Sequence, residues 1–219
     1  LVAGNHASQP TSTKRPVLSS RINQINASYG AGLWVNNTNA VATHGHTGPS
    51  GSATATLFVP NAGAPTGAYQ TRISGASKPP IPPNTYQEAT ESFKIKAAGI
   101  TRVQTSDGSG EYMDIDLVAM TITGGSAVII NKAITDAGDG WRLVKYTYAG
   151  NTARVAAISP NILYYIGSET ADGVKGVYTD EWQIEFGVVA TRYQRVVTAT
   201  NYDVVGFPLY LKGDSIDDF

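Results

Sequence analysis

The feature that most restricts the fold of this chain is a series of short segments in which apolar and polar residues alternate, each bounded by turn-forming residues. In EYMDIDLVAM, residues 111–120, the alternation places Met113, Ile115 and Leu117 on one side. A period of two residues is typical of a β-strand with one buried face. We therefore predict a strand here, with one face in a core. The residues on its polar side are Tyr112, Asp114 and Asp116.

Comparable segments recur along the chain at intervals of roughly 10–15 residues, punctuated by Gly, Asn and Asp. No segment shows a helical period over three turns. This pattern predicts a sandwich of two antiparallel β-sheets. The further strand-like segments are 54–59, 68–73, 86–98, 101–105, 126–134, 140–148, 153–158, 162–167, 177–187 and 192–200.

Composition excludes several classes of function. Hydrophobic residues make up 42% of the 219 residues, which is enough for a core, while charged residues make up only 15%. The net charge of −1 indicates no basic surface for nucleic acid. No apolar run reaches the roughly 18 residues that span a bilayer. The chain has no cysteine, which excludes disulfides and thiolate chemistry. We expect neither a nucleic-acid partner nor membrane insertion.

The sequence divides into three parts. Residues 1–24 are polar, contain two prolines and show no periodicity, so we predict an extended arm or linker that packs on a neighbouring subunit. Residues 25–200 contain the strand-like segments and form the predicted domain, which a proline-rich loop interrupts at 78–84. Residues 201–219 form a C-terminal extension.

Four motifs follow one another within the predicted domain. A Trp-containing stretch at 32–58 precedes TYQEATESFKIKAAG at 85–99, GDGWRLVKY at 138–146 and QIEFGVVATRY at 183–193. Their order resembles that of the carbohydrate-binding-module-like domains of bacteriophage structural and tail-fibre proteins, which are related to the family 4/9 type of module. The resemblance implies an all-β jelly-roll sandwich of two antiparallel sheets.

The two flanks extend this resemblance. ASQPTSTKRPVL at 7–18 is similar to an arm that precedes such modules, and FPLYLKGDSIDDF at 207–219 is similar to the opening of lectin-like modules in the same proteins. The resemblance therefore implies a component of the phage particle, which is extracellular. It implies other virion subunits as partners and a homo-oligomer, with a trimer favoured.

A glycan-binding surface requires aromatic rings for the C–H faces of a sugar and planar polar groups for its hydroxyls. Tyr112, Asp114 and Asp116 provide both on one predicted strand. Gln183 and Glu185 provide polar groups on another. We predict that these five residues bind glycan. The alternative is that they form an ordinary solvated face.

Two tryptophans are predicted to lie inside the fold. Trp141 follows a Gly-containing turn, and the corresponding residue in the family that the chain resembles belongs to the core. Trp182 alternates with Ile184 and Phe186, so its side of the strand is apolar. The polar residues of that strand are expected on the opposite, solvated side.

Metal and catalytic chemistry find little support. His44 and His46 would share a face on a strand, but no third ligand is evident and we predict a loop there. The acidic clusters at 107–116 and 213–218 match no helix-loop-helix calcium site. No cofactor is required, although the resemblance allows a structural Ca²⁺.

The sequence contains no familiar catalytic motif. No nucleophile elbow, phosphate loop or zinc motif occurs, so we predict that the chain is not an enzyme.

The sequence thus predicts a non-catalytic module of a phage virion, in a tail fibre or a capsid decoration. Its partner would be a cell-surface or mucus glycan, bound for host adhesion. Two alternatives remain open. One is a purely structural virion or assembly protein that binds no sugar. The other is the accessory carbohydrate-binding module of a secreted glycosidase.

Overall fold

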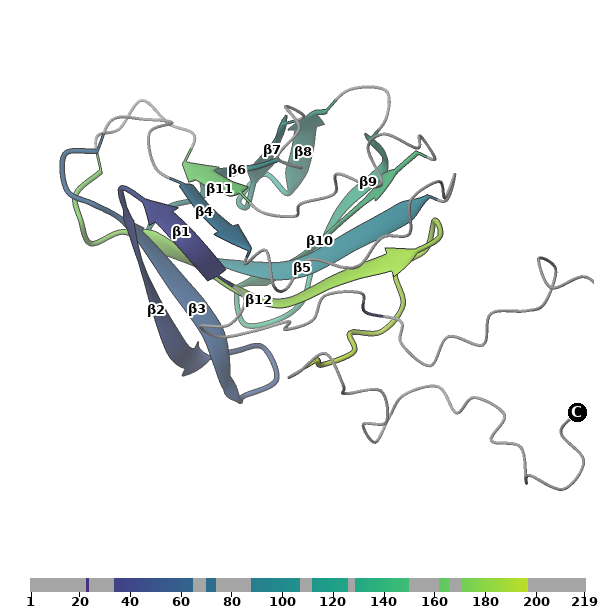
Figure 1. The fold of residues 1–219 in the computed structure, drawn as a ribbon, viewed down its shortest axis with the longest axis horizontal. Helices are drawn as coiled ribbons and strands as arrows, with labels where there is room; N and C mark the ends of the chain where they lie inside the picture. Colours follow the sequence, from purple (N-terminus) through teal and green to yellow (C-terminus); the bar gives the residue numbers. More distant parts are fainter. Residues whose placement is uncertain are drawn as a thin grey trace, which may run out of the picture.

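A computed structural model describes residues 23, 34–64, 70–73, 88–106, 112–125, 129–149, 162–165 and 171–196. These residues form two six-stranded antiparallel sheets, which stack as a β-sandwich (Figure 1). The predicted fold class, an all-β jelly roll of two antiparallel sheets, is confirmed. In the described residues, no helix is long and apolar enough to cross a membrane.

The chain passes repeatedly from one sheet to the other, so strands that are distant in sequence become neighbours. The first sheet has the order β1 (Trp34–Thr38), β4 (Gln70–Ile73), β11 (Ile162–Tyr165), β6 (Arg102–Ser106), β7 (Tyr112–Asp116) and β8 (Thr121–Gly124). The second sheet has the order β2 (Ala40–Thr47), β3 (Ala53–Pro60), β12 (Gly176–Phe186), β5 (Ala89–Ala98), β10 (Trp141–Tyr148) and β9 (Ile129–Asp136).

The hydrophobic core lies between the sheets. Phe93 of β5 stacks on Trp182 of β12 with ring centroids 4.0 Å apart. Met113 and Ile115 of β7 are buried in the same cluster. Burying each such side chain stabilises the fold by roughly 1.5–3 kcal/mol. The inward orientation predicted for Met113 and Trp182 is therefore confirmed.

A polar cluster lies within this core. Glu91 of β5 is fully buried, and the hydroxyl of Tyr148 donates a hydrogen bond of 3.2 Å to its carboxylate. Burial raises the pKa of the Tyr146 phenol well above its ordinary value, and the nearby Glu91 carboxylate adds to that rise. Tyr146 and Tyr148 therefore contribute apolar rings to the core while their hydroxyls lie near a buried carboxylate.

The turn before Trp141 forms as the sequence predicts. Gly138, Asp139 and Gly140 have φ angles of 85°, 50° and 80°, a region that glycine enters without a steric cost. The N–H of Trp141 donates to the carbonyl of Gly138 at 2.8 Å, which closes the connection between β9 and β10.

Trp141 is buried as predicted, but it lies outside the inter-sheet core. On β10, Val144 and Tyr146 point into that core, and Trp141 belongs to the opposite face by strand alternation. There it lies 6.4 Å from the ring of Tyr178, and the Lys96 ammonium lies 6.0 Å from its ring centroid. The prediction of core packing is correct for burial and wrong for the layer.

Some predicted strands differ in extent from the structure. The segment 111–120 is a strand only to Asp116, because the Asp116 carboxylate accepts hydrogen bonds from the N–H groups of Val118 and Ala119 and holds a turn. The segment 192–200 is irregular over 192–196, and its remaining residues lie outside the described part. The predicted strand at 153–158 also lies outside the described residues.

The three predicted parts of the chain are described unequally. Of the predicted arm, 1–24, the structure describes Asn23, which is buried against β12. The extension at 201–219 lies outside the described residues.

Candidate functional site

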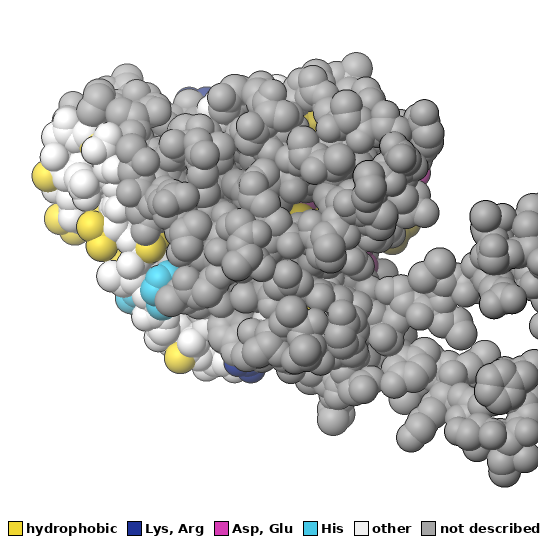
Figure 2. Space-filling view, viewed as in Figure 1, with side chains coloured by type: hydrophobic (Ala, Val, Ile, Leu, Met, Phe, Trp, Pro, Cys, Tyr) yellow, Lys and Arg dark blue, Asp and Glu magenta, His cyan; other side chains and the backbone are white. Residues whose placement is uncertain are grey.

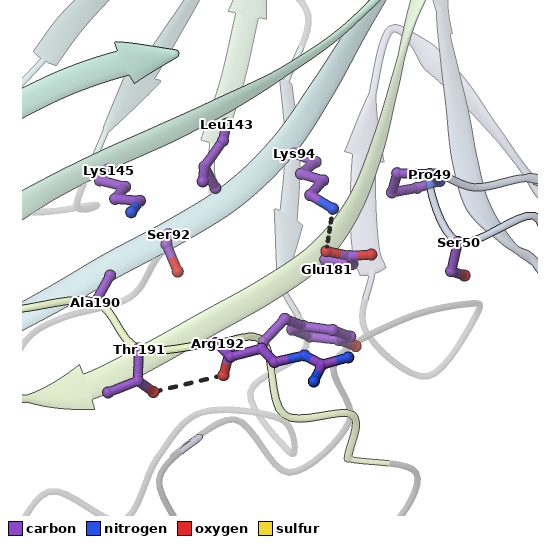
Figure 3. Close-up of a pocket in the computed structure, with 11 residues that line it drawn as sticks. Pro49, Ser50, Ser92, Lys94, Leu143, Lys145, Glu181, Ala190, Thr191 and Arg192 are labelled. Atoms are coloured by element: carbon purple, nitrogen blue, oxygen red, sulfur yellow. Dashed lines mark hydrogen bonds and ion pairs between the residues drawn. The ribbon is translucent and has the colours of Figure 1, made fainter. Parts of the chain in front are cut away.

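The outer face of the second sheet, which points away from the core, contains a groove of about 650 Å³ (Figure 3). We call it the sheet groove. Its walls are the turn at Pro49 and Ser50 and the segment 190–193 that follows β12. Its floor consists of Ser92 and Lys94 from β5, Leu143 and Lys145 from β10, and Glu181 from β12.

Strand alternation produces the floor of the sheet groove. Phe93 and Ile95 of β5 point into the core, so Ser92 and Lys94 point out. The register of β5 and β10 pairs Lys94 with Leu143 and Ser92 with Lys145. Side chains opposite each other on neighbouring strands lie on the same face. Two hydrogen-bonded strands thus place these floor side chains together.

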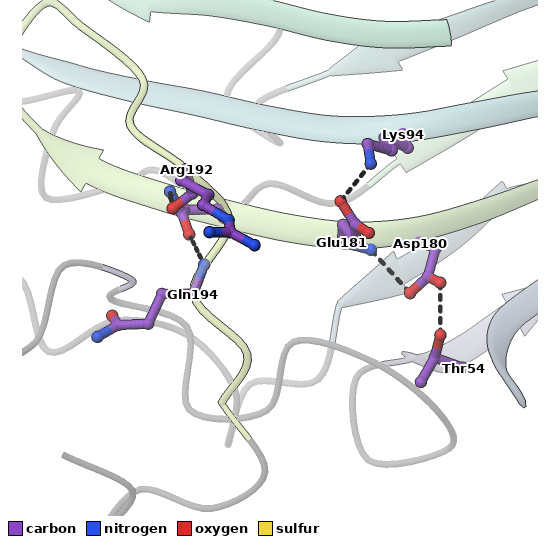
Figure 4. A network of polar contacts seen from close by, with 7 residues as sticks. Thr54, Lys94, Asp180, Glu181, Arg192 and Gln194 are labelled. Atoms are coloured by element: carbon purple, nitrogen blue, oxygen red, sulfur yellow. Dashed lines mark hydrogen bonds and ion pairs between the residues drawn. The ribbon is translucent and has the colours of Figure 1, made fainter. Parts of the chain in front are cut away.

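A β-bulge in β12 positions the acidic residue of the groove. The register with β5 shifts between Asp180 and Gln183, and Glu181 has a φ of 53°. An extra residue in one strand re-aims a side chain. The carboxylate of Glu181 lies 2.8 Å from the Lys94 ammonium, with both side chains mostly buried (Figure 4).

Asp180 anchors the turn that forms one wall. Its carboxylate accepts hydrogen bonds from the Thr54 hydroxyl at 2.6 Å and from the N–H of Glu181 at 2.8 Å (Figure 4). Burial raises the pKa of the Asp180 carboxyl above its ordinary value, and these two hydrogen bonds oppose the rise. A Cβ atom on Gly48 would lie 2.1 Å from this carboxylate, so a larger residue there would displace the Asp180 side chain.

The opposite wall is held by Gln183 and Glu185, and this corrects the sequence-based prediction. Both side chains point outward from β12, but they are 0% and 2% exposed because the chain after β12 covers them. Glu185 accepts hydrogen bonds from the N–H and the hydroxyl of Thr191 at 2.8 and 2.6 Å. Gln183 accepts one from the N–H of Gln194 at 2.6 Å. The predicted solvated face is absent at these two positions.

Asn23, which is 159 residues before Trp182 in the sequence, also supports this wall. Its side-chain amide donates to the carbonyl of Trp182 at 3.0 Å and accepts from the N–H of Ile184 at 3.3 Å. Strand β3 pairs with β12 only over Val177–Thr179. Beyond that pairing, the Asn23 amide forms hydrogen bonds with the backbone of β12. A residue from the predicted arm therefore belongs structurally to the sandwich.

The other predicted site residues lie on the first sheet. Asp114 accepts a hydrogen bond of 2.6 Å from the Gln104 amide, and Asp116 holds the turn after β7. Tyr112 begins β7, and its side chain lies outside the described part. Because Asp114 and Asp116 belong to one sheet and Gln183 and Glu185 to the other, the structure does not bring the predicted residues into one site.

The two described histidines lie on β2, not in the predicted loop. A bulge at Gly45, which has a φ of 84°, shifts the register so that His44 pairs with Thr56 and His46 with Ala55. Neighbouring residues of a strand face opposite ways, so the two histidines point to opposite faces. Figure 2 shows histidine side chains beside hydrophobic ones on the face of the molecule that it draws. The described residues contain no group of three or more potential metal ligands of the His, Cys, Asp or Glu type.

The sequence-based prediction did not include the residues that line the sheet groove. The alternation of segment 86–98 does place Ser92 and Lys94 opposite Phe93, so their outward direction was available from the sequence. The pairing of β5 with β10 connects floor residues about 50 positions apart, and the pairing of β5 with β12 connects residues about 80–100 positions apart, so no local pattern encodes them. The return of the chain after β12 is local, but alternation does not predict it.

No protein-family model and no curated protein matches the chain. A similar solved structure is the CBM22-1 xylan-binding domain of Xyn10C from Paenibacillus barcinonensis, with a TM-score of 0.38 and 14% identity over 77% of this chain and 94% of that one. Another is the CBM22-1–GH10 part of endo-1,4-β-D-xylanase 10B from Clostridium thermocellum in complex with xylohexaose. Its TM-score is 0.37 and its identity 11%, over 80% of this chain and 29% of that one. These likenesses are too distant to transfer a ligand.

Proposed function

We propose that this chain is a non-catalytic carbohydrate-binding module and that a glycan lies in the sheet groove. The volume of about 650 Å³ falls within the roughly 300–1,000 Å³ that small-molecule sites occupy. The groove is open along a sheet surface, which suits a chain-like ligand that enters from the side. The sequence resemblance to carbohydrate-binding modules points to the same class of ligand.

The mixture of side chains in the groove carries this proposal. Sugars present hydroxyls that need hydrogen-bond partners and C–H faces that need apolar contact. Ser92 provides a hydroxyl, and the Thr191 hydroxyl oxygen can still accept while its proton bonds to Glu185. Lys145 and Arg192 provide donors. Leu143 provides an apolar surface on the floor. Most of these side chains stand on paired strands, so the site is formed before a ligand arrives.

The number and pairing of the carboxylates at the groove favour a binding site over a site of glycoside hydrolysis. Glycoside hydrolysis uses a pair of carboxyl groups on either side of the bond that is cut. Among the described residues that line the groove, Glu181 is the one carboxylate, and it is paired with Lys94. Asp180 and Glu185 lie close in sequence but hold the walls through Thr54 and Thr191.

The setting of the module is a separate part of the proposal. An accessory module of a secreted glycosidase requires only a groove that binds sugar, so the sheet groove supports that setting directly. A tail fibre or capsid decoration of a phage, acting outside the cell in host adhesion, also requires assembly with other subunits, as a trimer or another homo-oligomer. The sequence resemblance supports this second setting. Co-purification of the protein with phage particles, or its presence in a secreted glycosidase, would distinguish the two.

The test is to remove the apolar floor of the groove and measure glycan binding. We expect the wild-type protein to be retarded in native gels containing at least one of a broad set of soluble plant, bacterial and animal polysaccharides. Leu143→Glu replaces the apolar contact on the floor with a carboxylate and should abolish the retardation. Val118→Glu makes the same change in the turn between β7 and β8 of the other sheet, where Val118 is 74% exposed, and should bind as wild type.

Thermal unfolding of both variants shows whether they remain folded. The proposal is wrong if the wild type binds none of the polysaccharides. It is also wrong if a folded Leu143→Glu variant binds as well as Val118→Glu does.

A further inference from the structure

The sheet groove has an excess of cationic side chains. Lys94, Lys145 and Arg192 line it together with the single carboxylate of Glu181, so three positive charges face one negative charge. The whole chain has a net charge of −1, so this excess is a local property of the groove. A concave surface lined by one sign of charge concentrates ligands of the opposite sign.

Two of the three cations are available to a ligand. Lys94 is neutralised by Glu181 at 2.8 Å. Within the described part of the chain, no ion pair joins a carboxylate to Lys145 or to Arg192. The two other acidic residues at this face, Asp180 and Glu185, accept hydrogen bonds from wall residues.

The two available cations come from different elements. Lys145 stands on β10 in the floor and is half-buried, whereas Arg192 is exposed on the wall that follows β12. Figure 3 shows them on different sides of the groove, with Ser92 between them in this view. A sugar residue in the groove would therefore have a cation on each side.

An anionic sugar fits this arrangement better than a neutral one. A guanidinium forms paired hydrogen bonds with a carboxylate or sulfate, and an ammonium attracts either group as a point charge. A neutral sugar would take water from Lys145 and Arg192 without compensating their charge, which is unfavourable. The groove thus discriminates by charge as well as by shape.

We infer that the sheet groove selects glycans with carboxylate or sulfate groups, and that Lys145 and Arg192 are the residues that recognise the anion. This inference rests on the proposed function. It names the chemical class of the ligand, an acidic polysaccharide, which the fold and the groove shape leave open.

The experiment compares polymers that share a backbone and differ in charge. Polygalacturonate is compared with its full methyl ester, and dextran sulfate with dextran, so that the first pair tests carboxylate and the second tests sulfate. We expect at least one charged polymer to bind about tenfold or more tightly than its uncharged partner. Binding of the charged polymer should weaken with added salt, because these cations are partly exposed.

Substitutions assign the effect to the two residues. Lys145→Gln and Arg192→Gln should each weaken binding of the charged polymer by about tenfold. They should weaken binding of the neutral partner much less, because glutamine still donates a hydrogen bond to a hydroxyl. The matched control is Lys132→Gln, because Lys132 is an exposed lysine of β9 that donates to the carbonyl of Gly124. It should bind as wild type.

The results separate the inference from the proposed function. Equal binding of charged and uncharged partners, abolished by Leu143→Glu, would overturn the inference and leave the proposed function standing. An equal loss in Lys132→Gln would overturn the inference, because the attraction would then come from overall charge. Absence of binding to all four polymers would overturn the inference too, while other polysaccharides still test the proposed function. Tighter binding of single-stranded DNA than of either charged polymer would overturn both.

Discussion

At the scale of single residues, the buried carboxyl of Asp180 makes the free energy of unfolding depend on pH. Its pKa in the folded state is raised by burial. The folded protein therefore holds a proton that the unfolded chain has already released as the pH rises through the ordinary aspartate range. This contribution to stability is fully present below the unfolded pKa and is lost as the pH rises through the folded pKa.

Asp180→Asn should remove that loss. The amide keeps one oxygen for the N–H of Glu181 and donates its own N–H to the Thr54 hydroxyl. We expect the free energy of unfolding of Asp180→Asn, relative to wild type, to increase from the acid side of the aspartate range to neutral pH. Urea unfolding at both pH values measures this. A relative stability that stays constant or decreases would contradict it.

An exposed aspartate gives a control of opposite sign. Hydrogen bonds from the N–H groups of Lys175 and Val174 lower the pKa of the Asp172 carboxyl. Its stabilising contribution is present above the unfolded pKa and is lost as the pH falls. Asp172→Asn should therefore lose stability relative to wild type over the same rise in pH.

At the scale of single residues, the sequence predicted the burial of Trp141 and the outward direction of Gln183 and Glu185, but it did not predict what covers these side chains. Trp141 is buried as its position after a turn predicts, yet Tyr178 and Lys96 contact it on the outer face. Gln183 and Glu185 point outward as the alternation predicts, yet they are buried. A period of two residues states the direction of a side chain and contains no information on the chain that later packs over it.

At the scale of elements, the C-terminal half of β12 pairs with β5 along one edge, and a side chain takes hydrogen bonds along its other edge. The Asn23 amide takes the hydrogen bonds that a neighbouring strand would take along Trp182–Ile184, and it also donates to the carbonyl of Gln194 at 3.0 Å. Asn23 thus connects the edge of β12 to the segment that forms one wall of the sheet groove.

Asn23→Asp should destabilise the fold because a carboxylate cannot donate to the carbonyls of Trp182 and Gln194. Leaving a buried group without its partner costs about 1–3 kcal/mol, so we expect a decrease of that size in the free energy of unfolding. Asn61→Asp, at an exposed asparagine whose backbone N–H bonds to Asn39, is the matched control. Equal stability of the two variants by chemical denaturation would show that the Asn23 amide does not support β12.

The existence of most strands was predictable at this scale, and their ends were less so. The segments 140–148 and 177–187 match β10 and β12 to within a residue or so, because Gly and Asp mark their boundaries. The segment 111–120 was predicted too long because Asp116 turns the chain where the apolar pattern continues. β2 was missed because its bulge at Gly45 breaks the alternation.

At the scale of the whole molecule, a sandwich has two outer faces, and the proposed function concerns the outer face of the second sheet. The sequence indicated Asp114 and Asp116 on the first sheet, whereas the groove opens on the second. The fold class was predictable because alternation is local. The groove was not, since it requires the pairing of β10, β5 and β12 and the return of the chain after β12.

Glycan contact in the sheet groove is most directly tested by mapping the amide chemical shifts of the ¹⁵N-labelled protein as an oligosaccharide of the bound polymer is added. We predict that the largest changes occur at Ser92, Lys145 and Arg192, with Asp114 and Asp116 of β7 unchanged. Largest changes at Asp114 and Asp116, with the groove unaffected, would contradict the account and return the glycan to the other face of the sandwich.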